Sequence, residues 1–501
     1  MRDCTARFAA RTLLCAILLG FSGVVSADEI PESKSVAEEL LEILRAAGTI
    51  NDTQYRELRD RARAEDAQRI EAAIEAAVAG ANEAVDEAAQ TAALAAAHAA
   101  ANPEPDPKDW KFKWNNEFQL DRNDGAFKLA FGGRIQSDWA MVELNGPLEN
   151  AIGGEGHGTE IRRARIFFSG TVYDRLIFKA QYEFANTGDG TIDLKDAYIG
   201  LKDLGPLGTV LVGHMKEPFS LEARTSSKDL MFMERSLANA FSPARNTGFA
   251  AHNTAHDKRI LWQAGVFKQT NSSAFSFDDD GRWNLGGRLV GVPLYEDGGE
   301  KVVHLAFSYS HQFRGGSDFM LRYRQRPESH LAPYLANTGA TIPTNDIDLI
   351  NPEIAVVWGP ASFQAEYVRS FVKGDDGMRN STFWATYAQL SYFLTGEHRN
   401  YKLGSGSFGR VKPSANFNPM KGDWGSFEVA ARYSYLDLND ESVRGGKMWD
   451  ITAGINWYLF PNTRLSLNYV HSELDNRLIS PDPNDVDGNA DIVQARFQLD
   501  F

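Results

Sequence analysis

The stretch FEVAARYSY, residues 427–435, decides the fold class, because apolar or aromatic side chains alternate in it with polar ones. Successive side chains of a β-strand point to opposite faces, so the odd-numbered residues share one face, while Glu428 and Arg432 lie on the other. Residues 451–459 and 465–469 repeat this pattern. An apolar face opposite a polar one, along segments of about ten residues, predicts strands that separate lipid from water.

The end of the chain continues the same pattern. One face of the last segment is apolar and ends in an aromatic side chain; its residues are Val493, Ala495, Phe497, Leu499 and Phe501. The residues between them are polar. A last strand that ends in Phe501 resembles the terminal signal that the outer-membrane assembly machinery reads in barrel proteins.

Soluble β-sandwiches also alternate, so the number and spacing of the segments matter. Residues 110–501 hold about sixteen to eighteen of them, more than a sandwich usually contains. Short turns such as residues 460–462 alternate with long polar loops, and Tyr, Trp and Phe gather near the segment ends. We expect an all-β transmembrane β-barrel of about 16 antiparallel strands over residues 110–501.

The first 27 residues have the organisation of a secretory signal peptide. Three arginines precede the apolar run of residues 13–21, and Val25-Ser26-Ala27 forms a small-residue cleavage site. We therefore expect the mature chain to begin near Asp28. The apolar run is shorter than the roughly 20 residues of a transmembrane helix, and no run of about 18 apolar residues follows, which leaves a closed barrel as the spanning structure.

Both cysteines, Cys4 and Cys15, lie within that peptide. The mature chain therefore has no thiol for a disulfide, a metal site or a nucleophile. A lipid anchor at Cys15 is excluded because the apolar run continues after this residue rather than ending before it.

Residues 28–102 predict an α-helical periplasmic segment. Two helical patterns flank a turn near its start, where Asn51 and Gln54 have the spacing of a capping box. The Ala-rich stretch at residues 59–101 then repeats apolar residues at helical spacing. This spacing fits an oligomeric coiled coil and also, because the heptads are imperfect, a single solvated helix that acts as a spacer.

Three prolines in residues 103–109 end helicity and predict a linker to the barrel. The formal net charge of the chain is -15, and residues 28–109 alone hold 19 acids against 8 bases. Since most of the negative charge precedes the barrel, the overall acidity says little about the charge of the lumen.

Three arginines in residues 159–168 are the first candidates for anion binding. The even-numbered residues from Ala164 onward are apolar, so alternation sends Arg163 and Arg165 to the lumen and leaves Arg162 near the rim. An arginine that faces lipid at mid-depth costs roughly 2 to 4 kcal/mol. In a water-filled lumen, by contrast, the guanidinium offers anions a fixed fork of donors.

Further bases, taken as a set, also indicate anion binding, because rings or ladders of Arg and Lys select anions in pores. They are Arg224, Lys228, Arg235, Arg245, Lys258, Arg259, Arg288, Arg369 and Arg432. The alternative is that each is an ordinary barrel charge balanced by neighbouring acids. Residues 216–258 form the longest interval without a strong strand, and a loop of this size predicts an inward-folded constriction.

Several motifs resemble the phosphate-selective porins O and P. They are GGRIQ at residues 132–136, RRAR at 162–165, DAYIG at 196–200, GHMKEPFSLE at 213–222, TSSK at 225–228, MER at 233–235 and the terminal Phe501. The resemblance covers nearly all of residues 110–501 and is strongest from 159 to 250.

This resemblance implies a sixteen-stranded barrel that assembles as a trimer, with an inward-folded third loop and basic residues that lead to a narrow anion site. Carried over by position, Arg162 and Arg163 match the family's paired arginines, Asp196 matches its acidic partner, and Ser226 and Ser227 match its loop serines. Strict alternation puts Arg162 and Arg163 on opposite faces. For both to reach one anion, a bulge or the rim must intervene.

One position departs from the family pattern. Phosphate-specific members carry a lysine where this chain has Ala223, and here Arg224 follows one residue later. A planar guanidinium differs from a compact ammonium as an anion ligand, so phosphate specificity is less secure than anion selectivity. The expected anion-binding residues are Arg162, Arg163, Arg165, Asp196, Arg224, Ser226, Ser227 and Lys228.

Enzyme signatures are absent from the sequence. His252 and His256 lack the glutamate of a zinc-protease helix and are interpreted as loop histidines. The acidic runs at residues 278–281 and 485–488 lack the spacing of an EF-hand and are interpreted as solvated external loops or weak sites for divalent cations. We predict no catalysis, no cofactor and no metal site.

The sequence thus predicts an outer-membrane porin for passive diffusion of phosphate or a related small anion. Its expected partners are outer-membrane lipid, two sister chains in a homotrimer, and the cell wall through residues 28–102, with no nucleic acid. A general porin, or one for another solute, is an alternative. A second alternative is a barrel that carries an adhesin or binding function on external loops at residues 326–350 and 395–425.

Overall fold

The computed structural model describes residues 36–100, 109–185, 192–277, 281–315, 319–375, 377, 379–441, 443–478 and 485–501. The expected signal peptide and all but Asp109 of the expected linker lie outside the described residues. The chain divides into two compact units, residues 1–105 and residues 106–501, each of which is treated by itself below.

The first unit is a helical hairpin. Helix α2 (Val36–Ala46) and helix α3 (Asp52–Ala100) flank a turn. Asn51 Oδ1 accepts hydrogen bonds from the backbone N–H groups of Thr53 and Gln54, and Gln54 Oε1 accepts one from Asn51 N–H at 3.1 Å. The capping box expected from the sequence is therefore present, and it satisfies donors that the first turn of a helix leaves unpaired.

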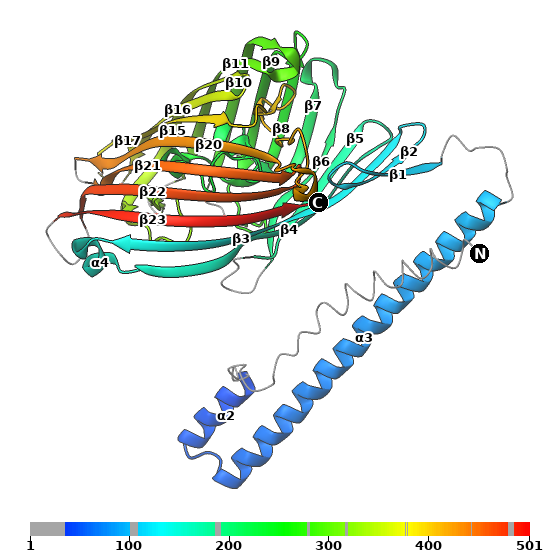
Figure 1. The fold of residues 1–501 in the computed structure, drawn as a ribbon. Helices are drawn as coiled ribbons and strands as arrows, with labels where there is room; N and C mark the ends of the chain where they lie inside the picture. Colours follow the sequence, from blue (N-terminus) through cyan, green and yellow to red (C-terminus); the bar gives the residue numbers. More distant parts are fainter. Residues whose placement is uncertain are drawn as a thin grey trace. The chain divides into compact units, whose positions relative to one another are not determined.

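The second unit is a closed antiparallel barrel of sixteen strands, as expected from the alternating segments (Figure 1). Its strands are β3 (Phe127–Leu144), β4 (Gly156–Val172), β5 (Leu176–Glu183), β6 (Asp193–Leu201), β7 (Thr209–Lys216), β8 (Arg245–Ala255), β9 (Ile260–Lys268), β10 (Trp283–Glu296), β11 (Lys301–Phe313), β15 (Ile342–Trp358), β16 (Ala361–Gly374), β17 (Ser381–Phe393), β20 (Ser426–Asp440), β21 (Val443–Phe460), β22 (Thr463–Leu478) and β23 (Asp485–Asp500).

Shorter elements lie in the connections. The helices are α4 (Gly146–Ile152), α5 (Leu221–Arg224), η1 (Gly205–Leu207), η2 (Leu237–Phe241), η3 (Asp297–Gly299) and η4 (Pro419–Lys421). The two-residue strands are β12 (Met320–Leu321), β13 (Arg324–Gln325), β14 (Ala336–Asn337), β18 (Tyr401–Lys402) and β19 (Ser407–Phe408). None of the described helices combines the length and the apolar composition that a membrane crossing requires.

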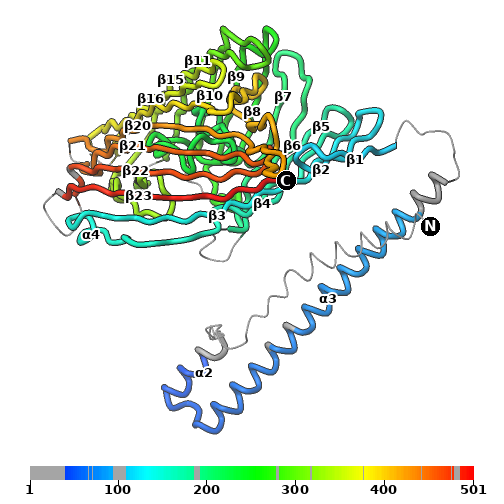
Figure 2. Tube along the Cα trace, in the orientation of Figure 1, coloured from blue at the N-terminus to red at the C-terminus, as the bar shows by residue number. Residues whose placement is uncertain are grey.

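The barrel closes where the last strand pairs with the first. Strand β23, red in Figures 1 and 2, lies beside β3, cyan, and Phe497 pairs with Ser137. Gly133 and Phe501 exchange backbone hydrogen bonds of 2.6 and 3.0 Å. A Cβ on Gly133 would lie 2.7 Å from both Arg165 O and the Phe501 ring, so a glycine lets the chain end fit here.

Beyond that closure, a hairpin widens the sheet. Strand β1 (Trp110–Trp114) pairs with β2 (Phe118–Arg122), and β2 pairs with the start of β3, where Phe118 lies opposite Phe131. The chain therefore joins the barrel wall through two short strands before β3 begins.

The two faces of the strands follow the predicted alternation. On β23, Val493 and Phe497 are 44% and 41% exposed, whereas Gln494 and Arg496 are buried. Strands β20, β21 and β22 show the same division between exposed apolar residues and buried polar ones. An apolar outer band and a polar inner face are what a barrel in lipid requires.

Three connecting segments contribute to the interior of the barrel. The first, residues 217–244, is named the inward loop; the predicted interval 216–258 was too long because it includes β8. The second connects β11 to β15, where Arg432 and Ser434 of β20 donate hydrogen bonds to the Glu328 carboxylate.

The third segment, residues 394–425, corrects an expectation. Arg410 of this segment donates to Pro461 O at 2.9 Å, in the short turn between β21 and β22. The segment therefore lies at the barrel end of the short turns, which is the periplasmic end in such barrels. The interpretation of residues 395–425 as an external loop is wrong.

The segment 394–425 does not extend into solvent because a set of its side chains packs inward. Tyr401 and Phe408 belong to an apolar cluster with Leu221 and Val290, and Tyr401 shares a 2.6 Å hydrogen bond with His304 Nδ1. The other expected external loop, residues 326–350, is also shorter than predicted, because β15 begins at Ile342.

Candidate functional site

The inward loop crosses the inside of the barrel from β7 and β8 to strands that lie far from them in the sheet. Asn456 Nδ2 of β21 donates to Met231 O at 2.8 Å, and Met233 N–H donates to Asn468 Oδ1 of β22 at 3.0 Å. Arg464 of β22 donates to Leu230 O at 2.6 Å. Polar side chains of the inner face thus pair with the loop backbone, which has no secondary-structure partners there.

The other end of the loop is fixed by α5. The N–H groups of Leu221 and Glu222 donate to the two carboxylate oxygens of Glu366 on β16, at 3.1 and 2.7 Å. Ser220 has a φ of 62° and its Oγ accepts a hydrogen bond from Ala223 N–H. A carboxylate and a hydroxyl therefore satisfy the first amides of this turn.

A β-bulge on β4 brings the two adjacent arginines to the same face. Gln136 of β3 pairs with Arg163, and the next residue, Ser137, pairs with Ile161, so Arg162 is the extra residue. A bulge inserts one residue and interrupts the alternation of faces. Of the two alternatives that the sequence argument allowed, a bulge or a position at the rim, the bulge is present, and the side chain of Arg162 reaches Glu234 of the inward loop.

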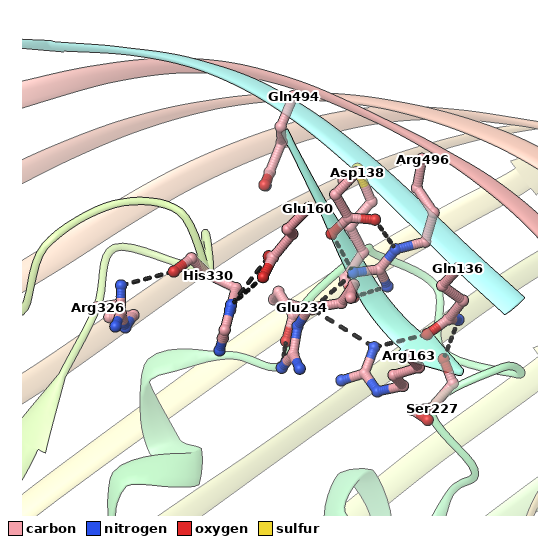
Figure 3. A network of polar contacts seen from close by, with 12 residues as sticks. Gln136, Asp138, Glu160, Arg163, Ser227, Glu234, Arg326, His330, Gln494 and Arg496 are labelled. Carbon is pink, nitrogen blue, oxygen red and sulfur yellow. Dashed lines mark hydrogen bonds and ion pairs between the residues drawn. The ribbon is translucent and has the colours of Figure 1, made fainter. Parts of the chain in front are cut away.

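Both arginines meet one carboxylate of the inward loop. Arg162 Nε lies 2.9 Å from Glu234 Oε1, Arg163 Nη1 lies 3.5 Å from it, and Arg496 Nη2 of β23 lies 2.7 Å from it. Arg496 also forms a two-pronged ion pair with Asp138 of β3, at 2.7 and 2.6 Å (Figure 3). These five residues are named the Glu234 cluster.

The charges of this cluster stabilise the ionised glutamate. Burial by itself raises the pKa of Glu234, but the nearby positive charges of Arg162, Arg163 and Arg496 outweigh it and hold the pKa well below its usual range. The cluster therefore attaches the inward loop to the wall, and its arginines already have a counterion.

Other predicted residues are also paired with acids. Asp196 of β6 accepts from Lys179 at 2.6 Å and from Arg245 at 2.7 Å. Arg165 is 2.5 Å from Glu183, and Lys228 is 2.9 Å from Asp500.

A cavity of about 510 Å³ lies between the inward loop and strands β3 to β9. Its lining includes eight basic residues, Arg134, Arg163, Arg165, Lys179, Lys216, Arg224, Arg235 and Arg245. Among the residues that the structure describes, two acidic ones line it, Asp196 and Glu217. Ser226 and Ser227 of the inward loop and Gly404 and Ser405 of the segment 394–425 complete part of its wall.

Four of these bases have no acidic partner within ion-pair distance among the described residues, and neutral oxygens hold them instead. Arg134 donates to Ser227 Oγ at 2.8 Å and to Ser226 Oγ at 3.4 Å. Arg235 donates to Glu222 O and Thr225 O, at 3.1 and 3.0 Å.

The other two of these four bases, Lys216 and Arg224, lie at the turn formed by α5 and Thr225. Arg224 donates to Lys216 O at 3.0 Å, and Lys216 Nζ donates to Ala223 O at 2.5 Å and to Thr225 O at 3.4 Å. We name Arg134, Lys216, Arg224 and Arg235 the uncompensated cations.

The structure divides the residues that the sequence proposed. Those that line the cavity are Arg163, Arg165, Asp196, Arg224, Ser226 and Ser227. Arg162 and Lys228 are not in its lining. Sequence reasoning missed Arg134 and Lys216 as candidates for this site, although Arg134 lies in the GGRIQ motif and alternates with the outward residue Ile135. It named Arg235 among the further bases of the pore but not among the expected anion-binding residues.

The structure also bears on the histidines and acidic runs that the sequence analysis considered as metal ligands. Within the described residues, no group of three or more His, Cys, Asp or Glu side chains could hold a metal ion. His252 lies on β8, so its interpretation as a loop residue is wrong, and residues 485–488 begin β23 rather than forming a loop. Residues 278–280 lie outside the described residues.

Comparisons with known proteins give concordant results. A family model described as phosphate-selective porin O and P matches residues 129–501. An uncharacterised protein of Caulobacter vibrioides is 31% identical over 401 residues, which cover 77% of this chain and 76% of that protein. Porin O of Pseudomonas aeruginosa is 27% identical over 416 residues, which cover 76% of this chain and 90% of that protein.

Among solved structures, an anion-selective porin from Comamonas acidovorans aligns with a TM-score of 0.47 and 14% identity, over 75% of this chain and all of that one. The outer-membrane channel DcaP of Acinetobacter baumannii aligns with a TM-score of 0.45 and 11% identity, over 75% of this chain and 98% of that one.

Proposed function

The chain belongs to the phosphate-selective porin O and P family and is an outer-membrane porin, and from this premise we propose that it passes small anions, phosphate or a related oxyanion, by passive diffusion. The observation that carries the proposal is the charge of the cavity, which eight basic and two acidic residues line. Rings of Arg and Lys select anions in pores because they replace part of the hydration shell that the ion loses.

Within that cavity the uncompensated cations do the binding. A cation that already faces a carboxylate gains little from a second anion, whereas one held by carbonyl or hydroxyl oxygens keeps most of its attraction for a mobile anion. Arg134 shares its contacts with Ser226 and Ser227, whose hydroxyl groups can donate to an oxyanion. The anion exchanges water for these donors and is released because its binding stays weak.

The inward loop and the segment 394–425 form the constriction in this proposal. A contact between the two segments supports this constriction, because Phe408 N–H donates to Thr225 Oγ1 at 3.4 Å. Arg288 of β10 also donates to Gly406 O at 3.0 Å, which ties the second segment to the wall. A narrow passage dehydrates the ion, and the surrounding cations then compensate the lost hydration.

The proposal also covers export and assembly. Residues 1–27 are a cleaved signal peptide, residues 28–102 are a periplasmic helical segment, and residues 103–109 link it to the barrel. Three chains form a trimer, and the helical segment packs as a coiled coil or contacts the cell wall. The mass of the detergent-solubilised oligomer, with and without residues 28–102, tests whether assembly depends on that segment.

Reversal potentials across planar bilayers test the anion selectivity. With a potassium chloride gradient, the proposal predicts a reversal potential close to that of chloride. A matched control exchanges Lys373 for Gln, which removes an exposed positive charge outside the cavity and should leave the potential unchanged. A preference of the wild-type channel for potassium would overturn the proposal.

A further inference from the structure

The ammonium group of Lys216 has an unusual environment for a half-buried lysine. Lys216 is the last residue of β7, and its Nζ contacts Ala223 O and Thr225 O without an acidic partner among the described residues. An ammonium group carries three donors, so two carbonyls leave one donor unassigned. A charge that is partly removed from water is stabilised by a counterion, because desolvation disfavours the charged form.

The carboxylates of Asp196 and Glu222 already bind other groups. Asp196 binds Lys179 and Arg245, and Glu222 accepts from Ser236 Oγ at 2.8 Å and from Arg432 at 3.3 Å. Glu217 Oε1 accepts from Asn246 and Asn284, at 2.7 and 2.6 Å, and Glu217 Oε2 has no hydrogen-bond partner among the described residues. No carboxylate in the described part of the chain therefore lies within ion-pair distance of the Lys216 ammonium group.

Other cations converge on the same turn. Thr225 O accepts from both Lys216 and Arg235, and Arg224 donates to the backbone oxygen of Lys216 itself. Like charges repel, and they persist at one place when an anion neutralises them. Ala223 lines the same cavity but contributes no charge.

We propose that Lys216 is an anion-binding residue of the pore, which places a compact ammonium beside residue 223 and gives the channel its preference for phosphate over chloride. This inference rests on the proposed function and deepens it. An oxyanion has several acceptor oxygens, so it can use the ammonium, the neighbouring guanidinium groups and the serine hydroxyls together, whereas chloride presents a single centre.

The test measures single-channel chloride current in the full-length protein as inorganic phosphate is added. Lys216→Gln should raise the half-blocking phosphate concentration about tenfold, because a charge-assisted hydrogen bond is lost, while chloride conductance falls less than about twofold. The matched control Lys373→Gln removes the same charge from an exposed site and should leave the block unchanged.

Two further variants separate binding from a purely structural role. The double variant Lys216→Gln/Ala223→Lys returns an ammonium to the same cavity from the other residue and should restore the block to within about threefold of wild type. Lys216→Arg keeps the charge but changes its shape, and it should weaken the block less than Lys216→Gln does.

The outcomes are distinct for the two proposals. A wild-type channel that phosphate does not block contradicts the proposed function itself. A blocked wild type whose Lys216→Gln variant is blocked equally well overturns the role of Lys216 alone. If Lys216→Gln does not assemble, Lys216→Arg decides instead. A phosphate block equal to that of wild type in this variant overturns the role of the Lys216 ammonium group as well.

Discussion

Two groups of cations around one loop differ in what holds them. In the Glu234 cluster, Arg162, Arg163 and Arg496 face a carboxylate, whereas the uncompensated cations face carbonyl and hydroxyl oxygens. The residue types are the same, so their chemistry is set by the partner. The first group fixes the loop to the wall, and in the proposed function the second offers positive charge to a mobile anion.

The largest effect is expected from breaking the first group. Glu234→Gln removes the shared counterion of the buried Arg163 and Arg496 and the half-buried Arg162, of which only Arg496 keeps another acidic partner among the described residues, Asp138. This should lower the free energy of unfolding by about 3 to 5 kcal/mol. Urea unfolding in detergent measures it. The released loop should also increase chloride conductance, seen in single-channel recordings.

A control for this variant is Glu441→Gln, which breaks the exposed pair with Arg379. Exposed pairs contribute about 0 to 1 kcal/mol, so the stability of this variant should stay close to that of wild type. Equal stability losses in the two variants would contradict the role assigned to Glu234.

A smaller effect is expected from breaking the second group. Arg235→Gln removes one uncompensated cation, and the phosphate concentration that halves the chloride current should rise about tenfold, equivalent to about 1.4 kcal/mol. Stability should change by about 1 kcal/mol or less, because only hydrogen bonds to two neutral carbonyls are lost. An unchanged block with a large loss of stability would show that Arg235 belongs to the structural group.

Arg162 sharpens the comparison because the sequence proposed it as an anion ligand. Arg162→Ala should lower stability by about 1 kcal/mol, since Arg163 and Arg496 still neutralise Glu234. The phosphate block should stay within about twofold of wild type, because Arg162 does not line the cavity. A tenfold weaker block would place Arg162 in the anion path instead.

The smallest effect is expected from pH. The pKa of Glu234 is depressed in the folded protein, so its stabilisation is fully present above the ordinary glutamate pKa of about 4.3 and is lost as the pH falls from there through the depressed value. Chloride conductance measured without phosphate should therefore stay constant from about pH 8 to pH 5. A conductance that rises between pH 7 and pH 5 would contradict the attachment of the loop by an ionised Glu234.

The fold was accessible from the sequence because strand faces follow from a local period of two. The alternation at residues 427–435 and at Phe501 predicted which side chains face lipid, and it correctly sent Arg163 and Arg165 inward. The bulge at Arg162 could be inferred only as one of two alternatives, since its presence depends on the register between β3 and β4.

The site was less accessible because it depends on contacts between distant parts of the chain. Nothing near Arg162 in the sequence indicates that Glu234 neutralises it, and nothing near Arg134 indicates that Ser226 and Ser227 lie beside it. The segment 394–425 was misplaced for the same reason. Its polar composition suggested solvent, while its position depends on contacts such as the one between Tyr401 and His304.

The most direct test of the account is single-channel chloride current of the wild-type protein titrated with inorganic phosphate at constant ionic strength. If the uncompensated cations form an oxyanion site, phosphate should reduce the current by half at a concentration far below that of chloride, and the block should saturate. A current that follows only the proportion of the two anions in solution would contradict the account.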